Sequence, residues 1–311
     1  MRIVFMGSSG FACASLELLL RSSFDEVVLV VTQPDRPRGR NLEVTGCQVK
    51  RFLEGRQIPV FSPLNINSDE SLERLSATRP DVIIVVAYGQ LLKTPLLVLP
   101  PQGCINVHGS LLPKYRGAAP VQWALAFGET VTGVTTMFVN DRMDAGDIIL
   151  KREIPVGPED TAVELHERLA HAGADVLMET MALVRAGKVP RMVQDEASAT
   201  YAPKLKKEDS VLDWNLTADG LYNRVRAFQP WPGCCCEIPA GGSRVKILKA
   251  RPELSEGTPG AISEVGPEGI LIQAGRGTAL RLLEIQPEGR KSMTCDAFLR
   301  GRRIVAGMMV H

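Results

Sequence analysis

The sequence has few of the features that mark membrane, secreted or metal-binding proteins. Its longest apolar runs, such as residues 27–31 and 82–87, are far shorter than the ~20 residues that a membrane-spanning helix requires. The seven cysteines are an odd number, and neither paired CxxC spacings nor nearby pairs of histidines complete a zinc site. We therefore expect no membrane segment, no disulfide scaffold and no metal.

The first residues give no sign of a targeting sequence. Residues 1–7 lead directly into a strand-like apolar segment, without the charged, apolar and small-residue sections of a signal peptide. We therefore predict a protein of the cytoplasm or of an equivalent reducing compartment. A length of 311 residues suffices for two domains, and we expect a monomer.

The sequence also lacks an excess of charge of either sign. It has 36 Lys and Arg against 35 Asp and Glu, a net charge of +1, which excludes a uniformly basic coat for nucleic acid. The balance differs along the chain, because residues 1–203 carry 20 basic against 23 acidic side chains and residues 204–311 carry 16 against 12. We expect any polyanionic partner to meet the second part mainly, in a contact that salt weakens.

The chain up to about residue 190 alternates short apolar runs with amphipathic segments, which is typical of a parallel sheet covered by helices. Two of the runs are continuously apolar, as in strands that are buried on both faces. The predicted strands are residues 2–6, 26–32, 81–87 and 148–154, and the predicted helices are residues 12–21, 69–78 and 161–186. We therefore expect an α/β domain over residues 1–189.

Residues 190–208 have the composition of an interdomain linker, because they are polar, contain Pro190 and Pro203 and end in a lysine-rich run. The rest of the chain, residues 209–311, contains one predicted helix and five short strands separated by glycine and proline turns. The helix is predicted over residues 217–228, and the strands over residues 234–238, 245–250, 260–265, 270–274 and 279–285. This pattern favours a small β-barrel, although strand number alone does not identify its type.

A glycine-rich turn, Gly7-Ser8-Ser9-Gly10, follows the first predicted strand. Its spacing differs from the G-x-G-x-x-G fingerprint of dinucleotide-binding domains. The second strand runs into Thr32-Gln33-Pro34-Asp35 instead of ending on an acid that would hold a ribose. We favour a tight strand-to-helix turn over a nicotinamide site.

The chemically informative segment is residues 103–120. Apolar Ile105 and Val107 alternate there with Asn106 and His108, as in a strand that projects two polar side chains from one face. An amide beside an imidazole can donate hydrogen bonds to a developing oxyanion or move a proton. A lone histidine is more often structural than catalytic, so the pair by itself is only a candidate site.

Three motifs in order resemble the folate-dependent formyltransferases. They are Asn-Val-His-Gly-Ser-Leu-Leu-Pro-Lys-Tyr-Arg-Gly-Ala-Ala-Pro at residues 106–120, Thr-Gly-Val-Thr at 132–135 and Met-Asp-Ala-Gly-Asp at 143–147. Segments at residues 32–40, 200–205 and 226–233 resemble the branch that formylates methionyl-tRNA. The resemblance covers essentially the whole chain. It implies a Rossmann-like catalytic domain and a C-terminal barrel of the oligonucleotide-binding (OB) type.

The resemblance also implies substrates and residue roles. The formyl donor would be 10-formyltetrahydrofolate, as a co-substrate, and the acceptor would be initiator methionyl-tRNA. The implied catalytic residues are Asn106, His108 and Asp144, of which Asp144 is distinguished from Asp141 and Asp147 by the motif alone. The implied folate-binding residues are Ser110, Leu111, Leu112 and Pro113. The implied tRNA-binding residues are Arg36, Arg38, Arg40, Lys204 and Lys206.

Formyl transfer suits these residue types. The reaction passes through a tetrahedral centre whose oxygen becomes negative, so donors such as Asn106 and His108 must face that oxygen. The acceptor α-amino group has an ordinary pKa of ~7.7–8.0, so part of it is neutral near pH 7. A carboxylate beside the imidazole would favour its charged form. Leu111, Leu112 and Pro113 offer an apolar wall to a pterin, and the alternative is a loop whose leucines pack into the core.

Two other functions account for part of the sequence. A formyltransferase acting on a nucleotide sugar or a purine precursor would share the chemistry, but it would not need the basic loop at residues 36–40 or the linker lysines. A non-catalytic RNA-binding protein would use Lys207, Arg224 and Arg226 as well, but it would leave Asn106 and His108 without a purpose. Because aromatic residues make up only 5% of the chain, contact with the RNA backbone is favoured over base stacking.

Overall fold

The computed structural model describes residues 1–38, 43–239 and 243–310, and the chain divides into two compact units. Unit 1 comprises Met1–Pro120, Val131–Pro155 and His166–Pro203. Unit 2 comprises Val121–Thr130, Val156–Leu165 and Lys204–His311. Two segments that precede residue 166 therefore belong to the C-terminal unit, and nothing in the sequence pattern indicated this.

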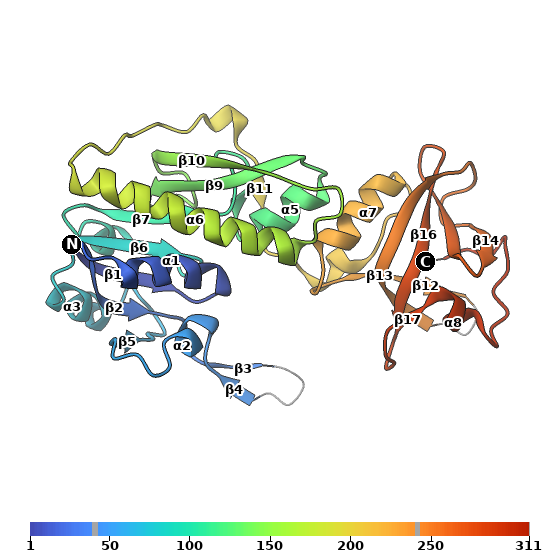
Figure 1. Ribbon diagram of the computed structural model, residues 1–311, viewed down its shortest axis with the longest axis horizontal. Coiled ribbons are helices and arrows are strands. Elements are labelled where there is room, and N and C mark those ends of the chain that lie inside the picture. The colour runs from blue at the N-terminus through green and yellow to red at the C-terminus, as the bar shows by residue number, and fades with distance from the viewer. Residues whose placement is uncertain (39–42, 240–242, 311) are drawn as a thin grey trace. The chain divides into compact units, whose positions relative to one another are not determined.

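A seven-stranded sheet forms the centre of unit 1, in the order β10-β9-β7-β6-β1-β2-β5 (Figure 1). Its parallel strands are β1 (Arg2–Gly7), β2 (Glu26–Val31), β5 (Val60–Phe61), β6 (Val82–Val86) and β7 (Cys104–His108). Two further strands, β9 (Val131–Phe138) and β10 (Ile148–Pro155), extend the sheet beyond β7. β9 runs antiparallel to β7, and β10 runs antiparallel to β9. Every residue of β6 is buried, as the continuous apolar run predicted.

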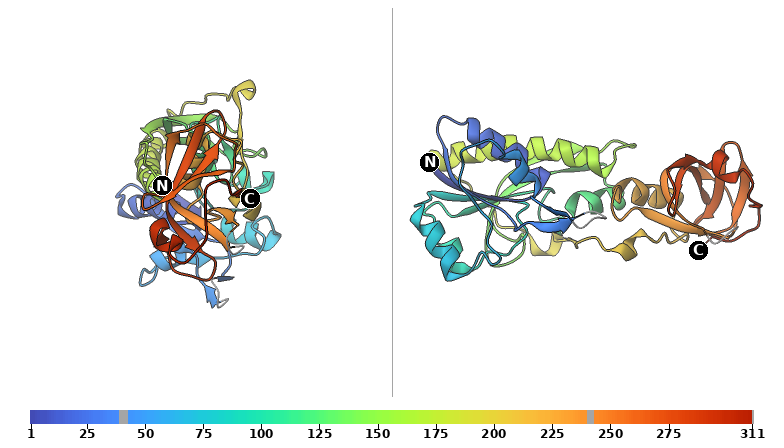
Figure 2. Two further views of the ribbon diagram at one scale, coloured as in Figure 1. Left: turned by 90° about the vertical axis from the view of Figure 1, so that its right-hand side faces the viewer. Right: turned by 90° about the horizontal axis from the view of Figure 1, so that it is seen from below.

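Helices cover both faces of this sheet. Helices α1 (Gly10–Arg21) and α6 (Ala162–Arg185) lie on one face and α3 (Asp69–Ala77) on the other (Figures 1 and 2). Gly173 allows α6 to approach β7, because a Cβ atom there would lie 3.0 Å from Val107 Cγ1. Among the described residues, no helix is both long and apolar enough to span a membrane. The α/β fold expected for this part of the chain is confirmed.

The ends of α6 follow the sequence signals. The predicted capping box is present, since the Thr161 N–H donates to Glu164 Oε2 at 3.0 Å and the Glu164 N–H to Thr161 Oγ1 at 3.4 Å. The helix stops before Gly187, whose φ of +65° suits a left-handed C-terminal residue. Shorter elements of unit 1 are β3 (Arg36–Arg38), β4 (Glu43–Thr45), α2 (Gln48–Phe52), α4 (Thr94–Leu97), β8 (Arg116–Gly117), a 3-10 turn (Glu196–Ser198) and β11 (Tyr201–Ala202).

The turn between β1 and α1 is the tight strand-to-helix turn that the sequence predicted. A Cβ atom at Gly7 would lie 2.7 Å from Ala12 Cβ and 2.9 Å from the Val86 carbonyl oxygen, so only glycine fits. The Gly10 N–H, at the start of α1, donates to Gln48 Oε1 at 2.5 Å. This turn therefore packs α1 against the sheet, and the first N–H group of α1 is bonded to a protein side chain.

An antiparallel sheet forms the centre of unit 2. The strand order is β12-β13-β16-β15-β14, with β17 paired to β16. The strands are β12 (Cys234–Ile238), β13 (Ser243–Leu254), β14 (Ile262–Gly266), β15 (Gly269–Ala274), β16 (Thr278–Pro287) and β17 (Met293–Thr294), and the helices are α7 (Ala218–Ala227) and α8 (Cys295–Leu299). A 3-10 turn spans Lys207–Ser210. The predicted helix and all five predicted strands are confirmed, and β17 and α8 are additional.

Side-chain contacts hold the two earlier segments in unit 2. Arg226 of α7 is 7% exposed, and its Nη1 donates to the carbonyl oxygens of Gly157 and Asp160 at 3.1 and 3.0 Å. Trp123 of α5 (Pro120–Ala126) packs edge-on against Phe228, with ring centroids 5.5 Å apart. Arg226, which an RNA-binding module would have used, is therefore committed to the protein interior.

These segments change the charge of the second unit. They contain no Lys or Arg, and their four acidic residues are Glu129, Glu159, Asp160 and Glu164. With residues 204–311 they bring unit 2 to 16 acidic against 16 basic side chains. The expectation of a basic C-terminal part holds for the sequence segment but not for the folded unit, because the added segments cancel the excess.

Unit 2 also contains a buried charge network on β16. Arg281 is 5% exposed, and its Nε and Nη2 donate to Glu253 Oε1 and Oε2 at 2.6 and 3.0 Å. Nη2 also donates to Glu264 Oε2 at 2.8 Å. The hydrogen bonds from Arg281 lower the pKa of the Glu253 carboxyl from its ordinary value to about 2. Because the pKa is lowered, the contribution of Glu253 to stability is complete above its ordinary pKa and is lost as the pH falls towards 2.

Glu253→Gln is expected to lower the free energy of unfolding of unit 2 by roughly 2 kcal/mol at pH 7, because Arg281 then loses its nearest counter-charge. The difference from wild type should shrink below pH 4.5, where the wild-type carboxyl takes up a proton on unfolding. Urea unfolding followed by tryptophan fluorescence measures it, since Trp123, Trp214 and Trp231 are the three tryptophans of the sequence and all lie in unit 2. An equal difference at pH 7 and pH 3 would contradict this account.

Candidate active site

The predicted amide and imidazole lie on β7, between β6 and β9. Asn106 is opposite Val85 of β6 and Met137 of β9, and His108 is opposite Thr135 at the C-terminal end of the strand. Because side chains two residues apart on a strand share a face, both project from the same face of the sheet. His108 is buried, whereas Asn106 is half-buried and its side chain has no hydrogen-bond partner among the described residues. Asn106 is therefore a donor that a ligand can use.

Both ring nitrogens of His108 face oxygen atoms. Nε2 lies 2.9 Å from the Tyr115 carbonyl oxygen, and because a carbonyl only accepts, Nε2 is the donor in this contact. Nδ1 lies 3.7 Å from Asp144 Oδ2, which is an electrostatic contact longer than a hydrogen bond. The residues that the motif grouped as His108 and Asp144 are thus brought together in space.

The geometry separates Asp144 from its two neighbours. Asp147 Oδ2 lies 3.5 Å from Arg191 Nη1, and Asp141 is exposed. The Asp144 Oδ2 atom instead accepts the Gly117 N–H at 2.8 Å, which turns the carboxylate towards the loop after His108. A Cβ atom at Gly117 would lie 2.5 Å from the Ala202 carbonyl oxygen, so a side chain there would displace this donor.

Residues 192–202, part of the predicted linker, belong to unit 1, and we call them the strap. Met192 pairs with Ile148, and β11 pairs with β8 in parallel. Within the strap, Gln194 is 5% exposed, and its Nε2 donates to the carbonyl oxygens of Asp144 and Gly146 at 2.9 and 2.8 Å. The strap therefore reaches the turn that carries Asp144.

Arg116 connects the strap to the loop after His108. It is 1% exposed, and its Nε and Nη2 donate to Gln194 Oε1 at 3.0 and 2.8 Å. Its Nη1 and Nη2 donate to the Glu196 carboxylate, which lowers the pKa of that carboxyl. The sequence predicted no role for Arg116 or Gln194. Arg116 lies within the quoted motif, whereas Gln194 carried no local signal beyond a polar neighbourhood.

The predicted folate loop divides into interior and accessible residues. Ser110 and Leu112 are 0% exposed: the Ser110 hydroxyl donates to the Lys114 carbonyl oxygen at 2.6 Å, and Leu112 packs with Met137 and Ile148. Leu111 and Pro113 are half-buried. For Leu112 the structure thus has the core packing that was the alternative to a pocket wall, and side-chain contact with a ligand falls to Leu111 and Pro113.

Hydrogen bonds from the sheet hold this loop in place. Thr135 Oγ1 donates to the Ser110 carbonyl oxygen at 2.7 Å and accepts the Leu112 N–H at 3.1 Å. Lys151 of β10 donates to the Leu112 carbonyl oxygen, and burial lowers the pKa of its ammonium group. The loop after His108 is therefore fixed by two neighbouring strands.

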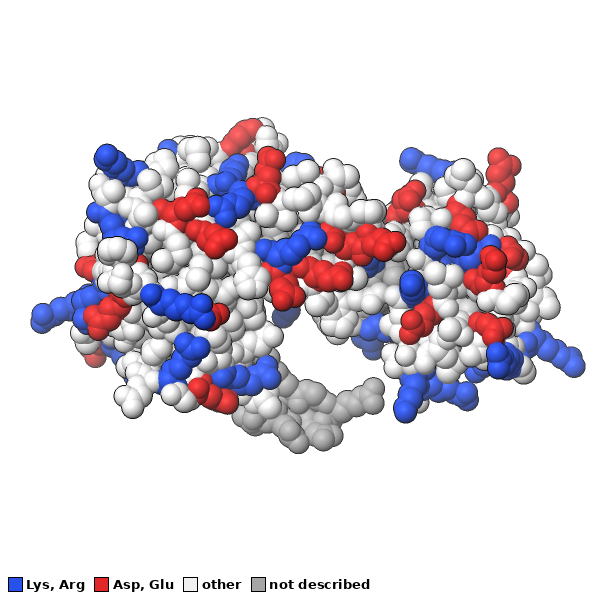
Figure 3. Space-filling model, viewed as in Figure 1, with Lys and Arg blue, Asp and Glu red and all other residues white. Residues whose placement is uncertain are grey.

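The predicted tRNA-binding residues are spread over both units. Arg36 and Arg38 lie on β3, which pairs with β4, and Arg40 lies outside the described residues. Lys204 and Lys206 are exposed at the start of the main segment of unit 2, and in the part of the chain that the structure describes their ammonium groups have no carboxylate partner. On the face shown in Figure 3, basic side chains of unit 2 gather along its lower edge, and acidic and basic side chains mix above it.

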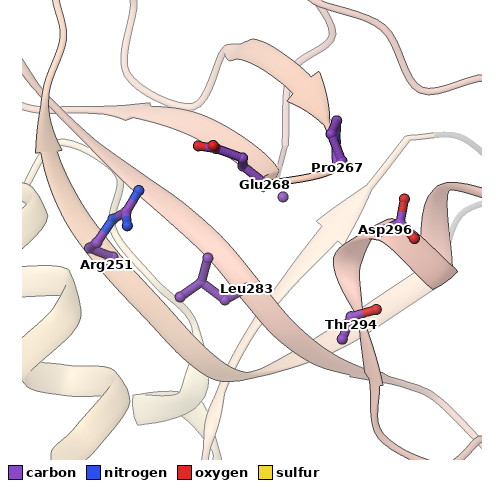
Figure 4. A pocket seen from close by; sticks show the side chains of 7 residues that line it. Arg251, Pro267, Glu268, Leu283, Thr294 and Asp296 are labelled. Atoms are coloured by element: carbon purple, nitrogen blue, oxygen red, sulfur yellow. The ribbon is translucent and has the colours of Figure 1, made fainter.

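A cavity of about 360 Å³ lies in unit 2, lined by residues from the segment 251–296. Figure 4 shows Arg251 of β13, Leu283 of β16 and Asp296 of α8 around it, with Glu268 from the β14–β15 turn. None of the site residues predicted from the sequence lines it. The cavity therefore contributes no residue to the site at Asn106 and His108.

Comparisons with known proteins identify the family. The family model described as formyl transferase matches residues 1–181, and the model of the formyl transferase C-terminal domain matches residues 204–303. The methionyl-tRNA formyltransferase of Geobacter sulfurreducens is 45% identical over 99% of this chain and 96% of its own length. That of Desulfotalea psychrophila is 45% identical over 98% of this chain and 94% of its own length.

A solved structure has the same fold. It is an N-formyltransferase from Helicobacter canadensis in complex with folinic acid and dTDP-3-aminofucose, with a TM-score of 0.68 and 17% identity, and the match covers 92% of this chain and 98% of that chain. At this identity the likeness concerns the fold alone. The two family models and the near-complete matches at 45% identity show that the chain belongs to the formyl transferase family, among its methionyl-tRNA formyltransferases.

Proposed function

We propose that the protein transfers the formyl group of 10-formyltetrahydrofolate to the α-amino group of initiator methionyl-tRNA, giving N-formylmethionyl-tRNA for translation initiation. The observation that carries the proposal is the 45% identity, over nearly the whole chain, to relatives named for this activity. The contact of His108 with Asp144 beside the unpartnered amide of Asn106 supplies the groups that such a transfer needs. The solved relative in complex with folinic acid supports a folate-derived donor.

The α-amino nitrogen attacks the formyl carbon, and a C–N bond forms while the formyl oxygen becomes an oxyanion. Asn106 donates its amide hydrogen to that oxygen, since its side chain is uncommitted. His108 can leave the Tyr115 carbonyl oxygen with its ring proton on Nδ1, towards Asp144, so that Nε2 is free to take the proton of the attacking amine. When the oxyanion collapses, the bond from the formyl carbon to the folate nitrogen breaks, and the proton lost by the amine passes to that nitrogen.

Asp144 acts through the imidazole in this scheme. Its carboxylate lies next to Nδ1 and balances the positive charge that His108 gains whenever it holds both protons. The proton released by the attacking amine can then reside on His108 until the leaving nitrogen accepts it. The three side chains thus divide the work into oxyanion binding, proton storage and charge compensation.

We assign folate contact to the loop at residues 110–113, with Leu111 and Pro113 touching the pterin and Ser110 and Leu112 fixing the loop. We assign tRNA binding to Arg36, Arg38 and Arg40 and to Lys204 and Lys206. In this proposal residues 1–189 carry the chemistry, residues 190–208, of which the strap is bonded to them, lead into the second unit, and residues 209–311 bind tRNA as an OB-like domain. The protein acts as a monomer in the cytoplasm.

The decisive assay incubates the purified protein with 10-formyltetrahydrofolate and one of three acceptors: methionyl-tRNA, free methionine or a dTDP-amino sugar. Formylmethionine is expected from the charged tRNA and at least tenfold less from the free amino acid, because the RNA contacts supply much of the binding. Product is measured by mass spectrometry after ester hydrolysis. Product from the amino sugar but not from charged tRNA would refute the assignment of the acceptor.

Asn106→Ala, His108→Ala and Asp144→Ala are each expected to lower kcat at least tenfold, because each removes a group that acts in the transition state. Steady-state kinetics with methionyl-tRNA measure the effect, and circular dichroism checks the fold. Asp141→Ala, which removes an exposed carboxylate near Asp144, serves as the matched control and should retain wild-type turnover. A variant with near-normal kcat would remove that residue from the mechanism.

Leu111→Asp is expected to raise the Kd of the folate at least tenfold by placing a charge against the pterin, while thermal stability stays close to wild type. Leu112→Asp would be a poor test, because that side chain is completely buried and a charge there would unfold unit 1. Leu254→Asp, at an exposed leucine, is the control. Equal folate affinity in Leu111→Asp and wild type, by calorimetry, would exclude contact through Leu111.

Replacing Lys204 and Lys206 together by Ala is expected to raise KM for methionyl-tRNA and to leave KM for the folate unchanged. The slope of log KM against log salt concentration should fall by about 1 for each lysine that meets a phosphate. Arg40→Ala should likewise raise KM for methionyl-tRNA and leave KM for the folate unchanged. Lys188→Ala is the control, because Lys188 is exposed outside the assigned set. A slope that the double substitution does not change would argue against phosphate contact by these lysines.

A further inference from the structure

We propose that Gln194 is a positioning residue for formyl transfer: its side-chain amide, held by Arg116, fixes the turn at residues 144–146 and so directs the Asp144 carboxylate to His108. The inference rests on the proposed function in that it gives Asp144 a role in catalysis. It adds a residue of the strap, about 50 positions after Asp144 in the sequence, to the machinery that sets the site's geometry.

The amide of Gln194 is bonded on both sides. Its oxygen accepts two hydrogen bonds from Arg116, at 3.0 and 2.8 Å, and its nitrogen donates to the carbonyl oxygens of Asp144 and Gly146, at 2.9 and 2.8 Å. The residue is 5% exposed, so water cannot readily replace these bonds. An amide is suited to this place because it carries an acceptor and a two-hydrogen donor on one planar group.

The turn that Gln194 grips needs support. Asp144 has a φ of +49°, in the left-handed region that is unfavourable for a residue with a side chain. At Gly146 a Cβ atom would lie 1.7 Å from the Phe138 carbonyl oxygen, so the turn is pressed against the end of β9. The two carbonyl groups that Gln194 binds flank Ala145. They therefore hold the backbone on both sides of the turn's centre in this strained form.

The segment Arg116–Gly117 holds both the backbone and the side chain of Asp144. The Arg116 side chain holds Gln194, which binds the Asp144 backbone, and the Gly117 N–H binds the Asp144 carboxylate at 2.8 Å. The hydrogen bonds thus form a closed circuit from the Asp144 backbone through Gln194, Arg116 and Gly117 to the Asp144 side chain. Such a circuit fixes the carboxylate in the position from which Oδ2 faces His108 Nδ1 at 3.7 Å.

Glu196 holds the outer side of Arg116. Its carboxylate accepts hydrogen bonds from Arg116 Nη1 and Nη2, and it is about half exposed. It also accepts a hydrogen bond from Arg142 Nη2 at 2.7 Å, but among the described residues it makes none to the turn at residues 144–146. Glu196 therefore offers a matched control: it lies two residues from Gln194, on the same strap and on the same arginine, but outside the circuit.

The test compares three variants of the full chain. Gln194→Met keeps the length of the side chain and removes its hydrogen bonds to Arg116, Asp144 and Gly146. Gln194→Glu keeps the bonds from Arg116 but presents a carboxylate to two carbonyl oxygens. Both are expected to lower kcat about tenfold and to leave KM for methionyl-tRNA and for the folate within about twofold. Glu196→Gln should keep kcat within about twofold. If Gln194→Met does not fold, Gln194→Glu, which retains the buried polar contact, carries the test.

A double-mutant cycle separates positioning from general support. If Gln194 acts through Asp144, Gln194→Met should lower kcat no further in an Asp144→Ala background. An equal loss in both backgrounds, or a wild-type kcat in Gln194→Glu with the fold intact, would overturn the inference.

A second readout does not depend on turnover. The ring ¹⁵N chemical shifts of His108 are expected to change in Gln194→Glu and to stay as in wild type in Glu196→Gln, because only the first alters the Asp144 contact. Unchanged shifts in both variants would overturn the inference. An inactive wild type whose His108 shifts follow this pattern would instead refute the proposed function and leave the positioning circuit supported.

Discussion

A buried imidazole needs partners for both of its ring nitrogens, and at His108 two segments of unit 1 bring an oxygen atom to each nitrogen. The strand that carries it is enclosed between β6 and β9, so neither nitrogen can rely on water. One partner comes from the loop that returns past residue 115, and the other from the turn at residue 144. Both segments, and the strap that fastens them, therefore meet around this one ring.

The elements set by local pattern could be read from the sequence, and those set by distant contacts could not. The apolar run at residues 82–87 and the alternation around Asn106 predicted strands. A strand that is buried on both faces is continuously apolar, and one that is buried on one face alternates apolar and polar residues. The burial of Leu112 and the membership of residues 121–130 in unit 2 depend on partners far along the chain. Gln194 was predicted to lie in a linker because it is a polar residue. The sequence does not show whether a polar side chain faces water or, as here, buried carbonyl groups.

The site shows the same division. Asn106 and His108 stand two residues apart, so strand periodicity alone placed them together. Selecting Asp144 among three nearby acids needed the family motif, since the choice depends on a left-handed turn and on a donor at Gly117. The positive charge predicted for the C-terminal part is absent from unit 2 for a similar reason, because four acidic residues that lie early in the sequence fold into that unit. Attraction for RNA then has to come from the placement of basic side chains and not from their excess.

The strap also constrains when the site can form during synthesis. Asn106, His108 and Asp144 leave the ribosome before the strap, and domains generally fold from the N-terminus as they emerge. The hydrogen bonds of Gln194 and of β11 are closed only once residue 202 is available, after about two thirds of the 311 residues have been made. A nascent chain can thus complete its parallel sheet while the turn at Asp144 is still unsecured, and the geometry of the site is set late, as one of the last steps in the maturation of unit 1.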